Sequence, residues 1–454
     1  MKRQIPVKKC VYFWLISIVF GAVLSLDVIK TVAPANTDTG TDREREIEEW
    51  LNVLDAPSDR QDERNYKERD AEVTPWLKDA ALPNPDNAAL LYYQAFLLRP
   101  EPNMATSSQI NEVLKGAEPG REIRIYLGRC LPMIQTAEVA SQIPQCAWGI
   151  WYGTEAGFGV NSLQIETRNL VFILAVDART LAADGHYRAA LARCSTIRRL
   201  ASHIGDETLL TYLTSRQIDS MALSTIQHVL GVMPPDSSTL AWLRGQLSVV
   251  QGVQPSIGKA LQADFESILY SLRNNPGYIE KIRTVTMRKG KNKQRERTSR
   301  NLTDDELLVP TREAYSSFLN SLFLVMDSDI AYERKLTRVK QMISELAEKY
   351  DDEPATGYVI SHCAGRLPEW YELQIEHHAH LNGIKAAVEI YLVVAKTGEL
   401  PRELPNHLPQ DPFTNRDFTY ERTEDGFALR CGGQDILGRR KGLLEFKVRK
   451  QIGR

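Results

Sequence analysis

Residues 163–204 read LQIETRNLVFILAVDARTLAADGHYRAALARCSTIRRLASHI. Apolar residues recur at helical spacing on both sides of a single Asp184-Gly185 interruption. One face carries Leu170, Leu174, Ala178 and Leu181, and the next carries Tyr187, Ala190, Leu191, Cys194, Ile197 and Ala201. This spacing predicts two helices joined by a glycine turn. The same periodicity continues to Val232 after a second break at Gly205-Asp206.

The turn between these two helices has a recognisable pattern. Gly185-x-Tyr187-x-x-Ala190-Leu191 is similar to one tetratricopeptide-type hairpin. A repeat array of that kind needs neighbouring copies at a fixed period to bury its hydrophobic faces. No second copy follows at a fixed spacing. We therefore predict a mainly α fold, a helical bundle or hairpin array, with a small C-terminal β-hairpin.

Capping and turn residues mark further helices. Asp86 or Asn87 is placed to cap a helix that follows at once, and Asp236 or Ser237 is placed to begin another after Pro234-Pro235. Helical spacing predicts additional helices over residues 122–142, up to about 272, over 312–350 and over 369–396. Residues 146–153 hold too many glycines and aromatics for a helix interior, so we predict a packed loop there.

Composition is that of an ordinary globular chain. Of its 454 residues, 43% are hydrophobic and 25% are charged. The formal net charge of -2 gives no overall attraction to nucleic acid or to membrane surfaces. The sequence contains no P-loop, no dinucleotide-binding glycine pattern, no HExxH and no paired CxxC. We therefore expect no cofactor and no nucleic-acid partner.

The N-terminus has the pattern of an export signal. Basic residues precede an uncharged, strongly apolar run from Cys10 to Leu26, which as a helix would span roughly 26 Å. We favour a signal anchor over residues 1–30, with residues 10–26 in the membrane and the rest of the chain outside the cytoplasm. The alternative is a cleaved signal, which would leave a secreted or periplasmic protein.

Two segments are dominated by charge. Residues 42–72 carry closely mixed acidic and basic side chains, which predicts a solvated spacer over residues 31–82 between membrane and body. Residues 283–305 contain a strongly basic cluster without interleaved aromatic residues. We interpret it as a mobile, solvated loop rather than a nucleic-acid or lipid site, because stacking aromatics are absent.

The six cysteines are too sparse for a disulfide scaffold. Cys130 and Cys146 lie close in sequence and could pair in an oxidising compartment, so their disulfide remains an open alternative. Cys194, Cys363 and Cys431 are isolated, and we interpret them as small buried hydrophobic residues.

One constellation has the composition of a metal site. Glu372, Glu376 and His380 fall at i, i+4 and i+8 of the helix predicted over 369–396, and His377 lies three residues before His380. A metal-dependent enzyme using Glu376, His377 and His380 is therefore the alternative function.

We favour a structural role for His377. It falls on an apolar face that we assign to Trp370, Leu373, Leu381, Ile384, Val388 and Tyr391. His380 borders that face, and we expect His378 in solvent. The spacing also lacks the Glu-x-x-His pattern of di-iron bundles.

The C-terminal motifs suggest a family. They are Thr397-Gly398-Glu399-Leu400-Pro401, Asp411-Pro412-Phe413, Phe418-Thr419-Tyr420 and Asp425-Gly426-Phe427-Ala428-Leu429. Their order resembles the tails of type II secretion pseudopilins. With the Cys146-x-Trp148-Gly149 loop and the Gly185-x-Tyr187 hairpin, the chain more closely resembles a family of uncharacterised, signal-anchored helical proteins of bacterial envelopes. The resemblance implies a fold and an envelope location, and it carries no established activity.

These observations divide the chain into six parts: a signal anchor (1–30), a charged spacer (31–82), a helical domain (83–282), a basic loop (283–305), long helices completing the bundle (306–397), and a β-hairpin with a basic tail (398–454). We expect a non-catalytic, membrane-anchored envelope protein that acts as a binding or assembly module with a protein partner.

Overall fold

The computed structural model describes residues 87–148, 156–205, 207–249, 255–274, 304–350, 364–432 and 442–448. The chain separates into two units, residues 1–60 and 61–454, and all described residues belong to the second. The predicted anchor, the charged spacer and the basic loop up to residue 303 lie outside the described residues. Within the described ranges, every helix is too short or too polar to span a lipid bilayer.

Four helices open the described part of the chain: α5 (Ala88–Leu97), α6 (Met104–Lys115), α7 (Arg121–Arg129) and α8 (Leu131–Gln142). Asn87 caps α5 by accepting a hydrogen bond from the Ala89 amide at 3.1 Å, as predicted. The single helix predicted over 122–142 is wrong, because the chain breaks at Cys130. Pro132 lies in the first turn of α8, where its missing N–H costs nothing.

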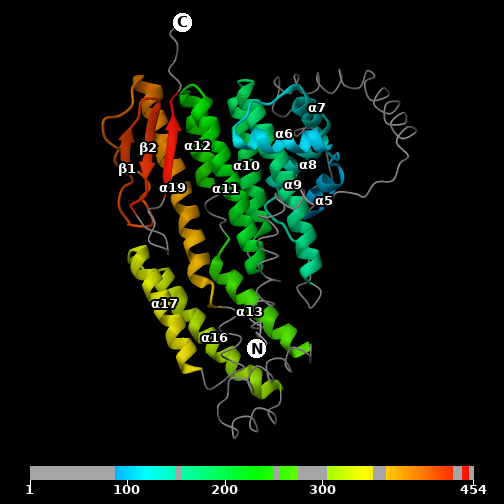
Figure 1. Ribbon diagram of the computed structural model, residues 1–454, viewed down its shortest axis with the longest axis vertical. Helices are drawn as coiled ribbons and strands as arrows, with labels where there is room; N and C mark the ends of the chain where they lie inside the picture. Colours follow the sequence, from blue (N-terminus) through cyan, green and yellow to red (C-terminus); the bar gives the residue numbers. More distant parts are fainter. Residues whose placement is uncertain are drawn as a thin grey trace, which may run out of the picture. The chain divides into compact units, whose positions relative to one another are not determined.

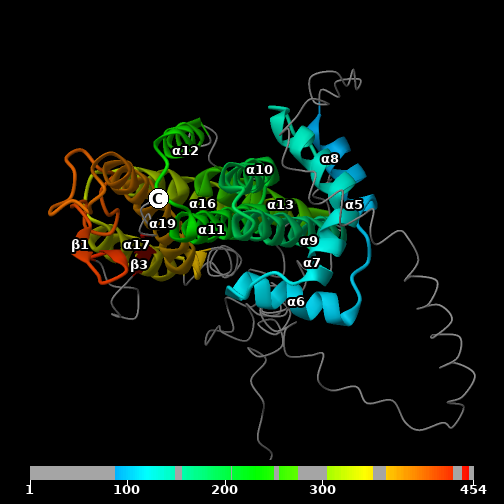
Figure 2. The same ribbon diagram turned by 90° about the horizontal axis from the view of Figure 1, so that it is seen from above.

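The central helices are α9 (Ala156–Ala183), α10 (Tyr187–Ile204) and α11 (Leu209–Val232), and both predicted breaks are confirmed. Gly185 ends the first helix with a φ of 90°, a conformation that favours glycine. Thr208 and Thr211 form a capping box at the start of α11. Figures 1 and 2 show these three helices side by side, with α10 packed against both of the others.

The described residues that follow form five more helices: α12 (Ser237–Val249), α13 (Ile257–Asn274), α16 (Asp304–Met326), α17 (Tyr332–Lys349) and α19 (Leu367–Thr397). Asp236 caps α12 by accepting from the Thr239 amide at 2.8 Å. Gly398 ends α19 with a φ of 77°. The long helix α19 packs against α11, α12 and α17, so it joins the central helices to the α16–α17 pair.

The C-terminal strands are β1 (Thr419–Arg422), β2 (Gly426–Arg430) and β3 (Leu443–Lys447), in the antiparallel order β1-β2-β3. The predicted hairpin is therefore confirmed, but the tail predicted after it contains a third strand. Phe427 and Phe446 face each other across β2 and β3 with ring centroids 5.0 Å apart. This sheet packs on α11 and α19 through β3.

The predicted loop at Cys146 is confirmed as far as Trp148, and residues 149–153 lie outside the described residues. The Trp148 indole is buried and stacks on Tyr92 of α5, with centroids 5.4 Å apart. Its Nε1 donates to the carbonyl oxygen of His203 at 2.6 Å. The loop therefore attaches α5 to the end of α10.

Candidate functional site

A buried polar cluster joins three of these helices. His377 of α19 places its Nε2 atom 2.7 Å from Asp219 Oδ2 on α11. The other oxygen of Asp219 accepts from Arg198 Nε on α10 at 2.8 Å. Exposed fractions are 3% for His377, 1% for Asp219 and 2% for Arg198. Both carboxylate oxygens of Asp219 therefore serve as internal acceptors.

Arg216 completes the cluster from the α11 side. Its Nη1 atom lies 3.4 Å from His377 Nδ1, and its Nη2 atom donates to Ser215 Oγ at 3.2 Å. The Ser215 hydroxyl in turn donates to the Ala201 carbonyl at 2.7 Å. Its proton is therefore directed to a backbone oxygen and not to His377, so these residues do not form an activated serine nucleophile.

Burial and neighbouring charge set the protonation states. Burial by itself would raise the pKa of Asp219, but Arg198 and then His377 bring that pKa below its usual range. Burial lowers the pKa of His377 against the opposing effect of Asp219. Neutral His377 then donates from Nε2 to Asp219, and its Nδ1 atom accepts from Arg216. The two hydrogen bonds assign this tautomer.

The predicted metal candidates do not converge on an open coordination site. His377 uses both ring nitrogens within the protein, and Glu372 is buried on the same helix. Among the described residues, no group of three or more histidine, cysteine, aspartate or glutamate side chains is arranged to hold a metal ion. His377 is buried, as its position on the apolar face of the helix predicted.

Two details of that helix differ from the prediction. His378 is half-buried rather than in solvent, and burial, followed by the influence of His377, lowers its pKa to about 4. Burial likewise lowers the pKa of His380 to about 4, and Glu376 is half-buried. Leu373 is exposed instead of lying on the apolar face, because the neighbouring helices cover a face of α19 centred on Tyr371, Ile375 and Ala379.

No disulfide joins the described cysteines, Cys130 and Cys146 included. Burial raises the pKa of Cys146, Cys194 and Cys431 to about 12. These three thiols stay protonated at neutral pH, which makes them poor nucleophiles. Cys10 and Cys363 lie outside the described residues.

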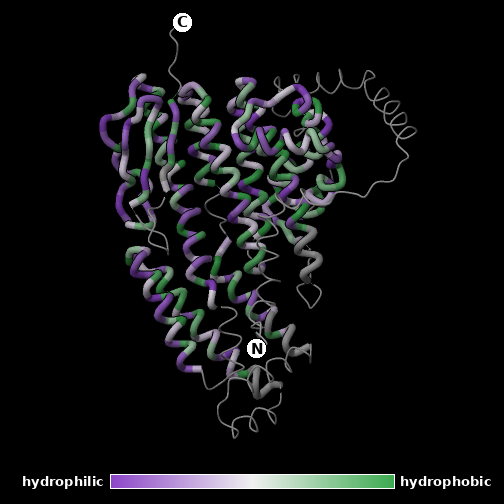
Figure 3. Tube along the Cα trace, in the orientation of Figure 1, coloured by the Kyte–Doolittle hydropathy of each residue, from purple (hydrophilic) through white to green (hydrophobic). Residues whose placement is uncertain are grey.

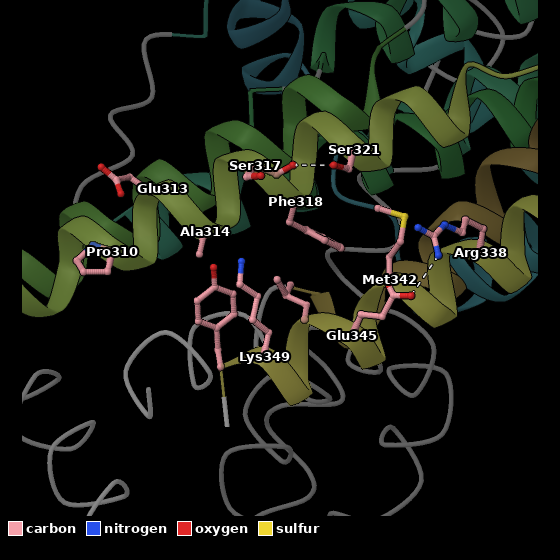
Figure 4. Close-up of a pocket in the computed structure, with 12 residues that line it drawn as sticks. Pro310, Glu313, Ala314, Ser317, Phe318, Ser321, Arg338, Met342, Glu345 and Lys349 are labelled. Carbon is pink, nitrogen blue, oxygen red and sulfur yellow. Dashed lines mark hydrogen bonds and ion pairs between the residues drawn. The ribbon is translucent and has the colours of Figure 1, made fainter. Parts of the chain in front are cut away.

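A groove between α16 and α17 is the second candidate site. It has a volume of about 480 Å³ and an apolar floor of Ala314, Phe318, Met342 and Leu346. Polar and charged side chains form its rim: Glu313, Ser317, Ser321, Arg338, Glu345 and Lys349. Figure 4 shows Phe318 and Met342 between the two helices and the ion pair that joins Arg338 to Glu345 at 3.2 Å. Figure 3 shows hydrophilic and hydrophobic residues alternating along α17, the pattern of an amphipathic helix.

Sequence reasoning missed three of the four members of the buried cluster. Arg198 falls four residues after buried Cys194, and Asp219 falls seven after buried Tyr212, so both lie on apolar stripes. A charged residue on an apolar stripe is the signal that could have identified them, since such residues are almost never buried unless paired.

Comparison with known protein families, curated proteins and solved structures finds no match for this chain.

Proposed function

We propose that this chain is a non-catalytic, membrane-anchored protein of the bacterial envelope that binds a protein partner. Four features support the proposal. The apolar run over residues 10–26 is suited to anchoring, and the C-terminal motifs resemble those of signal-anchored envelope proteins. The buried polar cluster links helices internally, so its chemistry serves stability. The groove between α16 and α17 offers a surface for a partner.

The groove is the observation that carries the binding role. Its α16 wall runs from Pro310 to Ser321, about 17 Å or three helical turns. An apolar floor with a charged rim is the form that accepts an amphipathic helix, whose apolar residues at i, i+3, i+4 and i+7 enter the groove. Arg338, Lys349, Glu313 and Glu345 provide charges of both signs for the polar edges of such a helix.

Site-specific photocrosslinking in intact membranes tests this role. A photoreactive residue replaces Ser317, which lines the groove, and in a matched chain it replaces the adjacent Ser316, which is exposed outside it. We expect one discrete protein adduct from position 317 and none from position 316. Equal adducts at both positions, or none at either, would remove the groove as the binding surface.

Fractionation tests the anchoring. We expect the full chain to remain with membranes after a high-salt wash, because burial of an apolar helix greatly exceeds peripheral electrostatic attraction. Release of a soluble mature chain that begins near residue 26 or 36 would contradict anchoring and leave the groove to be judged separately.

A further inference from the structure

An exposed apolar surface lies on and next to α5. Large apolar side chains are exposed at a few scattered positions of the described residues, but five of them lie within residues 90–104. Leu90 is 60% exposed, Tyr93 and Leu98 are each 39% exposed, and Leu97 and Met104, the first residue of α6, are each 87% exposed. We refer to these five side chains as the α5 face. Clustering of this kind marks an interaction surface, whereas single exposed apolar residues do not.

The helix presents this face in a fixed orientation. Leu90, Tyr93 and Leu97 follow one another at i, i+3 and i+7, which places them on one stripe. The opposite stripe of Ala88, Tyr92 and Ala95 is buried, and α5 packs mainly on α8. The Tyr93 hydroxyl donates to the Trp148 carbonyl at 2.9 Å. The outward stripe is therefore held away from the core.

Few charged side chains lie in the segment that carries this face. Between residues 87 and 104 the charged side chains are Arg99 and Glu101, and they bond to each other at 3.1 Å. The side chains of Leu90 and Leu97 on α5 and of Met104 at the start of α6 are mostly exposed. A fluid acyl layer accepts such side chains without a matching pocket, whereas a protein partner requires shape complementarity.

We propose that the α5 face inserts into the surface of the lipid bilayer and so attaches the chain to the membrane a second time, in addition to the N-terminal anchor. This inference rests on the proposed anchoring. Residues 27–86 connect the apolar run to Asn87, so an anchored chain cannot release α5 into bulk solution. Because anchor and α5 belong to one chain, the contact of α5 with the bilayer is an intramolecular step. The high effective concentration of the α5 face at the membrane then allows even a weak contact to form. Tyr93 has the amphipathic side chain that membrane interfaces favour.

Photocrosslinking in vesicles identifies the occupant directly. The full chain is reconstituted in phosphatidylcholine vesicles with p-benzoylphenylalanine in place of Leu97, and in a matched chain in place of Leu324 of α16, which is 77% exposed. Mass spectrometry measures the fraction of each chain that carries a phospholipid adduct. We expect the adduct at position 97 to exceed that at position 324 by about tenfold, since burial of the remaining Leu90 side chain favours insertion by about that factor.

The other outcomes of the crosslinking would refute lipid insertion, and flotation shows whether anchoring fails as well. An adduct at position 97 to another segment of this chain, to a second copy or to an added envelope protein would overturn lipid insertion, and so would equal lipid adducts at the two positions. Flotation of the vesicles tests anchoring independently. A chain that floats without the excess lipid adduct refutes only this inference, whereas a chain that fails to float refutes both. Met104→Glu is expected to lower the lipid adduct at position 97 and to leave flotation unchanged.

Discussion

Replacement of Asp219 by Ala is expected to lower the free energy of unfolding by about 3–5 kcal/mol, the usual cost of removing one partner of a buried ion pair. Arg198 makes one hydrogen bond among the described residues, and Asp219 is its acceptor. Loss of a hydrogen bond to a charged group costs about 1.5–3 kcal/mol. His377 also loses the acceptor of its Nε2–H group, which adds about 1–3 kcal/mol.

Urea denaturation at pH 7, followed by circular dichroism, measures this loss. Asp184→Ala is the matched control, because Asp184 pairs with Arg124 at 2.6 Å near the protein surface, where an ion pair contributes at most about 1 kcal/mol. The double variant Asp219→Leu with Arg198→Met removes both charges. We expect it to be more stable than Asp219→Ala, since no uncompensated guanidinium stays buried.

Two results would refute this reasoning. If Asp219→Ala costs no more than Asp184→Ala, the cluster does not depend on its ion pair. If the double variant costs the sum of its single variants, the two charges do not interact in the folded protein.

Four further predictions concern the sheet, the buried cluster and the histidines of α19. Phe427→Ala should cost about 3–5 kcal/mol in denaturant melts, because the side chain is fully buried. His377→Leu should cost less, about 1–3 kcal/mol, and it is not neutral because it leaves the Asp219 carboxylate without a donor. Gly426→Ala should lower the thermal midpoint, whereas Gly245→Ala on α12 should not, since the added Cβ would lie 2.0 Å from a backbone oxygen of β3 in the first case and in open space in the second. Stability should fall from pH 7 to pH 5 and fall less in His378→Gln: the folded pKa of about 4 lies below the unfolded value of about 6.5, so the unfolded chain binds more protons in that window.

Several elements were predictable because their signals are local. The Asp184-Gly185 break, the Asn87 and Asp236 caps and the Gly398 stop depend on residues within one helical turn, and the structure confirms each of them. The break at Cys130 was missed because residues 122–142 keep helical spacing across it. The strand β3 was missed because its five residues acquire a partner only when Phe446 meets Phe427.

The candidate site was predictable only in part. The apolar periodicity of α19 identified His377 as a buried histidine, because a helix that packs on a core must bury one face. The same periodicity placed Leu373 on the wrong side, since the sequence does not specify which neighbouring helix covers which part of a long helix.

The sequence by itself determined most of the helices, several of their ends and the presence of a C-terminal hairpin, because these features depend on backbone hydrogen bonds and caps between residues close in the chain. Only the tertiary structure decided that His377 meets Asp219, which lies 158 residues away. It also decided that Arg198 shares the same carboxylate and that α16 and α17 leave a groove between them. The reason is physical: a buried charge is stable only beside its partner, and the docking of whole helices determines which partner that is.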